Sequence, residues 1–523
     1  MIRLESHVCG RWVAGTAAGR PFVDPTSGEV LGHIDSTGVD CAAALQHARD
    51  VGGPALAALT FEARGALVGA IADVLAAKRD TWVDIARRNS GNTPRDAAID
   101  VDGAVGTLKY YARLSKSLGG ARTILEPGSD RLAKGDTFEA RHVWTTRPGV
   151  AVHINAFNFP AWGLWEKVAV ALLAGSPVVA KPASGTAWLA EAMVRAVHAA
   201  GVVPDGVLSL VCGAAEGLLD AVGPFDAIAF TGSAATGRMI RAHEGVLAAN
   251  PRLGIEADSV NVAVLAPSAG AGSAAVERLL EQALAAVSVK AGQLCTNIRR
   301  ILVPRPLRDA FVEALATRID GLTVGDPGCD GVDVGPLVDE KQLRAAFAGL
   351  AVLARETRVV RGGGIPATVV GADAGKGAFL APTLLVAEDG RDLQAVHDIE
   401  VFGPVVTVLA YDDVADAARL AARGEGSLAA SVYADDPAEA AALVAALAPL
   451  HGRVLAVDTV VGRSHTGHAI VMPMCVHGGP GRAGGGEELG GLRGLRFYMQ
   501  RTAIQGSPAM LAALTADAVT ATL

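Results

Sequence analysis

The feature that most constrains this chain is a series of short apolar runs that alternates with helical stretches from about residue 150 onward. The runs are Val150–Ile154, Pro177–Ala180, Val207–Val211, Asp226–Phe230 and Val260–Leu265. Continuous Val, Ile and Ala runs are typical of parallel strands buried on both faces, because helices cover both sides of such a sheet. The sequence therefore predicts an α/β protein with a doubly wound sheet.

A second α/β series follows Glu256. It predicts helices over 273–289, 307–319 and 414–423, and strands over 300–303 and 405–409. Nearer the N-terminus, apolar residues recur with a period close to 3.6 over 61–90, which predicts a helix. The glycine-rich stretch Gly478–Gly494 is interpreted as a loop. Two α/β domains are therefore expected.

Composition and charge exclude several classes of protein. Half of the 523 residues are hydrophobic and 19% are charged, so the chain can bury a large core and is not disordered. A net charge of −8 argues against a nucleic-acid or anionic-membrane surface, which would need a basic face. The six cysteines are scattered without zinc-ligand spacing, so we expect free thiols and no metal. With no signal pattern and no apolar span, we expect a cytoplasmic protein without membrane contact.

Two glycine motifs resemble phosphate-binding loops. The GxGxxG match at Gly479–Gly484 follows no adequate strand, so we interpret it as a flexible loop. The segment Gly232–Arg238 resembles a P-loop but has Arg in place of the required Lys, which disfavours a Walker NTPase. Because Gly232 joins a strand to a helix, its turn could hold a pyrophosphate against the helix dipole; a tight turn without a ligand is an equal alternative.

Three further signals are weak individually. A lone cysteine is usually a small buried hydrophobe, but Cys295 lies among Gly, Gln, Thr and Asn, which raises the odds of a reactive thiol. Glu256 precedes an apolar strand, where a surface carboxylate is the ordinary interpretation. Asn155 and Asn158 end a predicted strand; asparagine is common in such turns, but its amide can also stabilise an oxyanion. Only the order and spacing of these residues decide between the alternatives.

In that order, the chain resembles the aldehyde dehydrogenase superfamily over essentially its whole length. The matching segments are Asn155-Ala156-Phe157-Asn158-Phe159-Pro160, Lys181-Pro182-Ala183-Ser184, Phe230-Thr231-Gly232-Ser233 with Gly237, Glu256, Gly292-Gln293-Leu294-Cys295 and Glu400-Val401-Phe402-Gly403-Pro404. The resemblance implies that Cys295 is the nucleophile, Glu256 the general base and Asn158 an oxyanion-hole donor. It also implies cofactor-binding residues: Lys181 and Glu400 at the ribose hydroxyls, Phe402 near the nicotinamide, and the Gly232–Ser233 turn under the pyrophosphate. Asn155, Phe157, Ser184 and Gly237 complete this cofactor-binding set.

Three departures from the family pattern matter. Position 184 commonly holds Glu in NAD-preferring relatives; here it is Ser, whose hydroxyl can donate to a ribose 2′-phosphate that a carboxylate would repel. We therefore expect NADP as the cofactor. The usual Glu-Leu-Gly-Gly is replaced by Glu256-Ala257-Asp258-Ser259, and Glu256 and Cys295 are 39 residues apart, several more than is common. Both changes could move Glu256.

With these departures, the chain resembles a narrower group within the family. The enzymes of that group oxidise CoA-thioester semialdehydes during the aerobic breakdown of aromatic acids such as benzoate. The implied substrate is thus an acyl-CoA aldehyde, by analogy alone. An enzyme for free semialdehydes or aliphatic aldehydes is one alternative. A catalytically silent protein that retains the fold, with a lengthened loop between Glu256 and Cys295, is another.

The resemblance also implies a domain organisation. It predicts a Rossmann-like cofactor domain over 1–135 and 155–255, a catalytic α/β domain over 256–475, and a small β oligomerisation segment over 136–154 and 476–523. Residues 136–148 and 495–504 should form the hairpin and strand through which subunits pair. We expect a homodimer.

Overall fold

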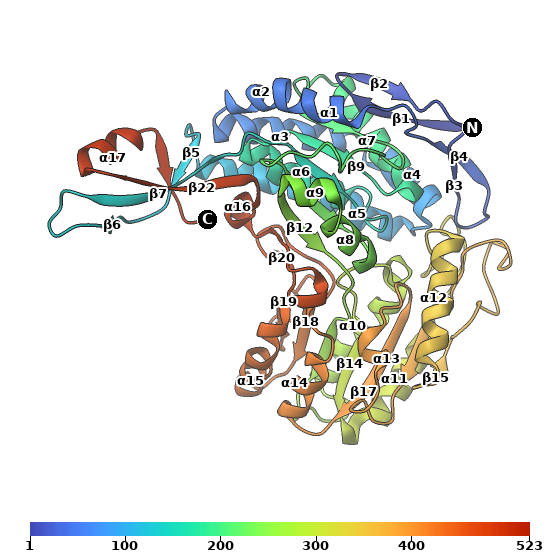
Figure 1. The fold of residues 1–523 in the computed structure, drawn as a ribbon. Helices are drawn as coiled ribbons and strands as arrows, with labels where there is room; N and C mark the ends of the chain where they lie inside the picture. Colours follow the sequence, from blue (N-terminus) through green and yellow to red (C-terminus); the bar gives the residue numbers. More distant parts are fainter.

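A nine-stranded sheet forms the centre of the first lobe in the computed structural model, which describes residues 1–523 (Figure 1). Its main path runs β12-β11-β8-β9-β10-β1-β4-β3, with β2 paired to β1. The five strands from β12 to β10 are parallel. The bounds are β1 (Ile2–Val8), β2 (Arg11–Ala14), β3 (Arg20–Val23), β4 (Val30–Ile34), β8 (Ala151–Ile154), β9 (Val178–Lys181), β10 (Leu208–Leu210), β11 (Ala227–Thr231) and β12 (Arg252–Glu256).

Helices bury both faces of this sheet, which explains why its strands are apolar at successive positions. Ala151 and Val178 pack with the helices α3 (Phe61–Ala76), α5 (Pro94–Leu114), α6 (Trp162–Ala174) and α7 (Ala187–Ala199). The alternate residues Val152 and Val179 pack on the opposite face with α1 (Cys41–His47), α8 (Ala234–Arg241) and α9 (Glu244–Ala249). Successive side chains of a strand point to opposite faces, so a sheet covered twice requires apolar residues at both.

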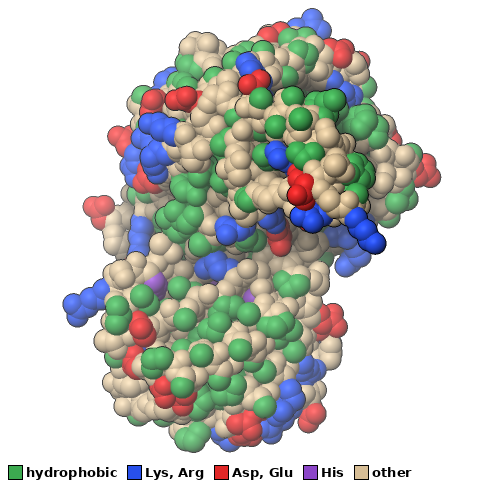
Figure 2. Space-filling view, turned by 90° about the vertical axis from the view of Figure 1, so that its left-hand side faces the viewer, with side chains coloured by type: hydrophobic (Ala, Val, Ile, Leu, Met, Phe, Trp, Pro, Cys, Tyr) green, Lys and Arg blue, Asp and Glu red, His purple; other side chains and the backbone are tan.

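A seven-stranded sheet organises the second lobe, in the order β15-β16-β17-β14-β13-β18-β19. Its strands are β13 (Val262–Leu265), β14 (Arg300–Pro304), β15 (Arg358–Arg361), β16 (Thr383–Val386), β17 (Val405–Tyr411), β18 (Ser427–Tyr433) and β19 (His451–Val457). One face packs on α10 (Ala274–Ser288) and α11 (Arg308–Asp320). The other packs on α12 (Glu340–Leu353), α14 (Val414–Ala422) and α15 (Pro437–Leu447). Figure 2 shows the molecule narrowing between its two lobes.

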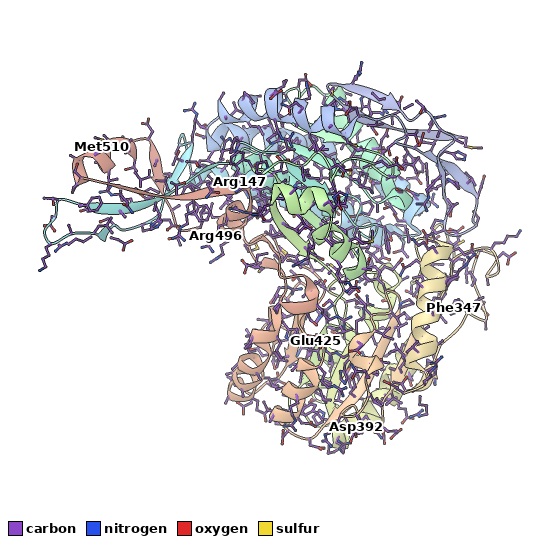
Figure 3. All side chains as sticks on the ribbon, viewed as in Figure 1. Arg147, Phe347, Asp392, Glu425, Arg496 and Met510 are labelled. Atoms are coloured by element: carbon purple, nitrogen blue, oxygen red, sulfur yellow. The ribbon has the colours of Figure 1, made fainter.

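An arm projects from the first lobe (Figure 1). Its sheet runs β22-β7-β5-β23, with β6 paired to β7. The strands are β5 (Thr123–Leu125), β6 (Asp130–Arg131), β7 (Glu139–Thr146), β22 (Met499–Gly506) and β23 (Ala518–Thr520). The helix α17 (Pro508–Leu514) connects β22 to β23. Met510 lies far out on the arm and Arg147 at its base, where Arg147 Nη1 donates to Gln500 Oε1 at 3.0 Å (Figure 3).

The predicted elements are mostly found, with bounds set by local capping. Ser273 Oγ accepts from the Val276 amide, so the helix predicted over 273–289 begins at Ala274. The helix predicted over 61–90 is instead two helices, α3 and α4 (Arg79–Ser90). Lys78, between them, has non-helical backbone angles, and the Trp82 indole donates to the Leu75 carbonyl at 2.9 Å across the break. The remaining helices are α2 (Gly53–Ala57), α13 (Ala395–Asp398) and α16 (Leu495–Tyr498).

Three expectations need correction. The run Val260–Leu265 forms β13 of the second sheet, and the strand beside β11 is β12, which the sequence had not indicated. The strand Ala151–Ile154 lies inside the nine-stranded sheet rather than in an oligomerisation segment over 136–154. The predicted loop 478–494 contains the strand β21 (Glu487–Leu489), which pairs with β20 (Val476–Gly478).

No single helix has the length and apolar composition needed to cross a membrane. The pair Cys41–Ala57 and Phe61–Ala76 passes the same test only jointly, and it is bent by 115°.

Candidate active site

The candidate site is a cavity at the carboxyl edge of the first sheet. Asn155, Thr231 and Glu256, which line it, stand at or just after the ends of the parallel strands β8, β11 and β12. Ligand sites in open parallel sheets occur at this edge, because the loops that leave the strands diverge there. The cavity also takes Cys295 from the loop before β14 and His477 from β20.

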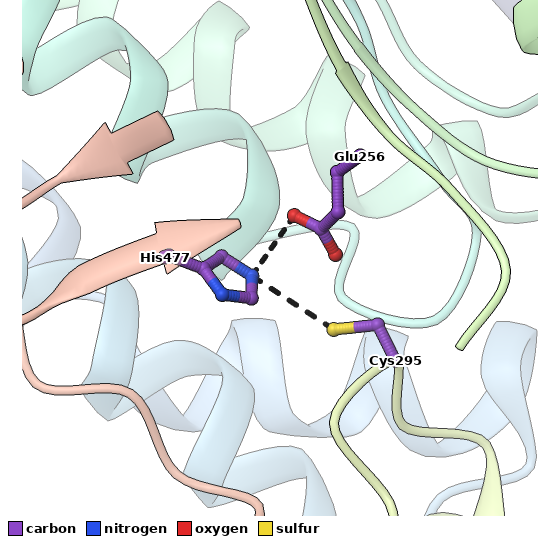
Figure 4. A group of neighbouring side chains, drawn as sticks. All are labelled: Glu256, Cys295 and His477. Carbon is purple, nitrogen blue, oxygen red and sulfur yellow. Dashed lines mark hydrogen bonds and ion pairs between the residues drawn. The ribbon is translucent and has the colours of Figure 1, made fainter. Parts of the chain in front are cut away.

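Cys295, Glu256 and His477 meet in this cavity (Figure 4). His477 Nε2 lies 2.9 Å from Glu256 Oε2 and 3.9 Å from Cys295 Sγ. The side chains of Glu256 and His477 are 3% and 8% exposed, so their ion pair is well shielded from water. The second carboxylate oxygen of Glu256, Oε1, is buried without a hydrogen-bond partner. The predicted nucleophile and base are thus together, and one carboxylate oxygen is free to accept a proton.

The charges of these groups depend on one another. Burial and the nearby Glu256 carboxylate together raise the pKa of the Cys295 thiol to about 11, although His477 opposes the rise. Burial disfavours the charged form of Glu256, but His477 and Lys167 outweigh it and hold the pKa of that carboxyl well below its usual range. The Glu256 carboxylate in turn raises the pKa of His477, against the effect of burial. At neutral pH the resting site therefore holds a thiol, a carboxylate and an imidazolium.

The backbone before Cys295 has a conformation that few residues accept. Gly292 has φ +71°, and a Cβ there would lie 2.2 Å from the Gly403 carbonyl oxygen. Lys290 and Ala291 also have positive φ, at +51° and +50°. Such angles are unfavourable for residues with a Cβ and persist only where surrounding contacts enforce them. The loop therefore holds the nucleophile in a set position.

Two polar side chains donate hydrogen bonds to carbonyls of the same loop. Asn261 Nδ2 donates to the carbonyls of Cys295 and Asn297, both at 2.9 Å. Arg299 donates to the carbonyls of Gly292 at 3.0 Å and Leu294 at 3.2 Å. These bonds are buried, where leaving a carbonyl unpaired would cost about 1–3 kcal/mol.

The predicted oxyanion donor is in place beside the cavity. Asn158 Nδ2 donates to the Gln293 carbonyl at 3.1 Å, which fixes the amide next to the loop of Cys295 and leaves its second N–H free. Asn155 also lines the cavity, and neither its amide nitrogen nor its amide oxygen has a partner. Unpaired buried amides of this kind are consistent with a polar ligand.

Some of the residues predicted to bind a cofactor are free to contact a nucleotide, and others are already paired within the chain. Lys181 is half-buried, and its ammonium donates to the Pro182 carbonyl at 3.4 Å. Burial lowers the pKa of Lys181, and the neighbouring Arg20 lowers it further. Two cations so placed favour an anionic ligand. Ser184 begins a short 3₁₀ turn beside them and is half-buried.

The residues predicted to lie near the nicotinamide and its ribose already contact other residues of the chain. Phe157 and Phe402 form an edge-to-face pair with ring centroids 5.6 Å apart. Glu400, predicted to bind ribose hydroxyls, has Oε1 paired with Arg299 at 3.1 Å and Oε2 accepting from the Ser259 amide at 3.0 Å. Oε1 accepts from both Nε and Nη2 of Arg299. Oε2 retains a second lone pair, so a ribose hydroxyl can still donate to it.

The turn predicted to cradle a pyrophosphate already holds a carboxylate of the chain. Asp258 Oδ1 accepts from the Ala234 amide at 2.9 Å, and Ser233 Oγ accepts from the Thr236 amide at 3.3 Å. Gly232 and Gly237 lie at this start of α8, where Gly237 packs against Ile255. Asp258 stands where the family pattern has glycine, so this departure puts a negative charge at the expected phosphate position.

Several site residues escaped sequence reasoning. His477 lies in a stretch that we assigned to oligomerisation, and no local pattern distinguishes it. Lys167, on α6, is 2% exposed and lies 3.0 Å from Glu488 Oε2 and 3.4 Å from Glu166 Oε1. Glu166 and Lys167 also line the cavity. The one signal available in the sequence was the pair of charged residues, Glu166 and Lys167, within an otherwise apolar helix.

Comparisons with known proteins show the family of this chain. The sequence model described as "Aldehyde dehydrogenase family" matches residues 12–504. The 3,4-dehydroadipyl-CoA semialdehyde dehydrogenase of Aromatoleum evansii is 50% identical over 479 residues, which are 92% of this chain and 93% of that protein. The betaine aldehyde dehydrogenase of Vibrio vulnificus is 27% identical over 81% of this chain and 85% of its own.

Solved structures show the same fold. Succinate-semialdehyde dehydrogenase from Burkholderia pseudomallei superposes with a TM-score of 0.81 at 26% identity, covering 96% of this chain and 98% of that one. Betaine aldehyde dehydrogenase from Staphylococcus aureus, in complex with NAD⁺, has a TM-score of 0.83 at 24% identity, covering 97% and 95%. The α/β architecture predicted from the sequence is thereby confirmed.

Proposed function

Because this chain belongs to the aldehyde dehydrogenase family, we propose that it oxidises a CoA-thioester semialdehyde to the acid with NADP. A 3,4-dehydroadipyl-CoA semialdehyde, formed in aerobic benzoate breakdown, is the substrate we favour. The observation that carries this proposal is the 50% identity to an enzyme of that name over 92% of the chain, together with Cys295 and Glu256 facing one cavity.

The first half of the reaction is acylation of Cys295. The thiolate attacks the aldehyde carbon, and the carbonyl oxygen becomes an oxyanion. The free N–H of Asn158 and the backbone N–H of Cys295 are the donors placed to stabilise it, each worth about 10²–10³ in rate at comparable sites. The rigid loop around Gly292 supplies this geometry before the substrate arrives.

The second half is release of the acid. A bound nicotinamide would supply the hydride acceptor, and loss of the hydride would leave Cys295 as a thioester. Oε1 of Glu256, which has no partner, accepts a proton from the attacking water. The thiolate then leaves, and the acid is free.

Substrate choice is tested by comparing two aldehydes. We expect kcat/KM for the CoA-thioester semialdehyde to exceed that for the corresponding free semialdehyde acid by about 10²-fold or more, because the CoA part adds binding energy. Equal values would return the chain to the class of free-aldehyde dehydrogenases. No turnover with either, under conditions where a related dehydrogenase is active, would favour a catalytically silent protein.

NADP preference follows from the corner formed by Lys181, Arg20 and Ser184. In Ser184→Glu, the new carboxylate should repel the 2′-phosphate and raise the KM for NADP by about tenfold or more, whereas the KM for NAD should fall or stay the same. Steady-state kinetics with both cofactors measure this. The control is Ser184→Gln, which is similar in size but carries no charge; an equal effect of both variants would contradict an electrostatic origin.

We also propose a homodimer formed through the arm. The strand β22 pairs with β7 on one side only, and most of its residues are exposed. An unpaired edge strand on a projecting arm is suited to contact with a second copy. Sedimentation at micromolar concentration should give a dimer, and a monomer alone would contradict this.

A further inference from the structure

One ring nitrogen of His477 faces both reacting groups of the site. Its Nε2 lies 2.9 Å from Glu256 Oε2 and 3.9 Å from Cys295 Sγ (Figure 4). A single N–H can be fully donated to one of these acceptors at a time, and it favours the one that is anionic. The charge state of the pair therefore decides which group His477 stabilises.

The surroundings favour a positive charge on this ring. Besides Glu256, the carboxylates of Glu166 and Glu488 lie near it, and Glu488 is the backbone partner of His477 between β20 and β21. Lys167 is the one cation paired with these two carboxylates. With the carboxylates in excess, the imidazolium is stabilised despite burial.

We propose that His477 is a catalytic residue whose imidazolium stabilises the Cys295 thiolate, both when sulfur attacks the aldehyde and when it leaves the product. The role deepens the proposed function and rests on it for the identity of the reaction. Its geometry does not depend on the substrate, because all three groups belong to this chain.

The proton balance of this step is simple. The S–H bond of Cys295 breaks, and the proton goes to Oε1 of Glu256, which has no other partner. Glu256 becomes neutral, so the N–H of His477 turns from Oε2 to the new thiolate. Glu256 passes its proton to solvent before it is needed as the base for water. After hydrolysis, the proton that it took from water returns to sulfur.

Thiol alkylation tests the role without any aldehyde. The rate at which iodoacetamide modifies Cys295 is measured against pH by mass spectrometry, in a Cys475→Ser background that removes the exposed thiol. In His477→Gln, the thiolate loses its cation, so the thiol pKa should rise and the rate at pH 7 should fall by about tenfold for each pH unit of that rise. We expect at least a tenfold fall.

A second variant separates His477 from Glu256. In Glu256→Gln, the Cys295 sulfur is the titratable group that remains beside Nε2, and the imidazole can take the thiol proton itself, so alkylation at pH 7 should equal or exceed the wild-type rate. The double variant Glu256→Gln with His477→Gln should again be slow. In His477→Ala, added imidazole should restore part of the lost rate, while thermal melting confirms that the protein is folded.

An unchanged pH profile of alkylation in folded His477→Gln would overturn the proposal, as would equal rates for Glu256→Gln with and without His477. The proposed function fails differently. A protein that oxidises none of the tested aldehydes, but whose Cys295 still depends on His477, would refute the substrate assignment and leave the role of His477 intact.

Discussion

Replacing Cys295 with alanine should abolish aldehyde oxidation, with a loss in kcat of about 10⁴-fold or more. The reason is that the covalent adduct needs a nucleophile, and Cys295 is the one cysteine lining the cavity. The measurement is formation of the reduced nicotinamide with a CoA-thioester semialdehyde.

The matched control for this variant is Cys475→Ala, which removes an exposed thiol two residues before His477. It should keep most of the wild-type kcat. If Cys295→Ala retained more than a few per cent of the activity, the nucleophile would have to be sought elsewhere.

Replacing Glu256 with glutamine should separate the two halves of the reaction. Acylation should continue, because His477 can take the thiol proton once the carboxylate is gone. Release of the acid should slow by about 10²–10⁴-fold, since water has lost its base. A quenched-flow experiment should therefore show a rapid burst of about one reduced nicotinamide per site, followed by a slow steady state.

Two observations check the origin of that burst. The mass of the intact protein should increase by the acyl group during the steady state, and hydroxylamine should remove the added group. The control Glu216→Gln changes an exposed carboxylate that does not line the cavity, and it should behave as wild type. A slow reaction without a burst would mean that Glu256 is required for acylation as well.

The sequence by itself determined the fold class and the main chemistry. Apolar runs such as Pro177–Ala180 became strands because a strand covered by helices on both faces needs apolar residues on both of its sides. Cys295, Glu256 and Asn158 could be named because a reacting carbonyl demands a thiolate, a base and an oxyanion donor, and their order along the chain matched the family.

Sequence reasoning failed where neighbours distant in the chain decide the outcome. The run Val260–Leu265 was predicted correctly as a strand, but not its sheet, because sheet membership depends on pairing with β14 and β18. The break within 61–90 falls at Ala77 and Lys78, two residue types that ordinarily favour a helix. Neither is a property of local composition.

Only the tertiary structure decided the electrostatics of the site. His477 is separated from Cys295 by 182 residues, and nothing in its local sequence indicates that it meets both the nucleophile and the base. The same holds for the ion pair between Arg299 and Glu400, and for the hydrogen bond that Asp258 accepts from the Ala234 amide at the start of α8. Interactions between charges depend on distance and burial, and these are fixed only when the two lobes and β20 come together around the cavity.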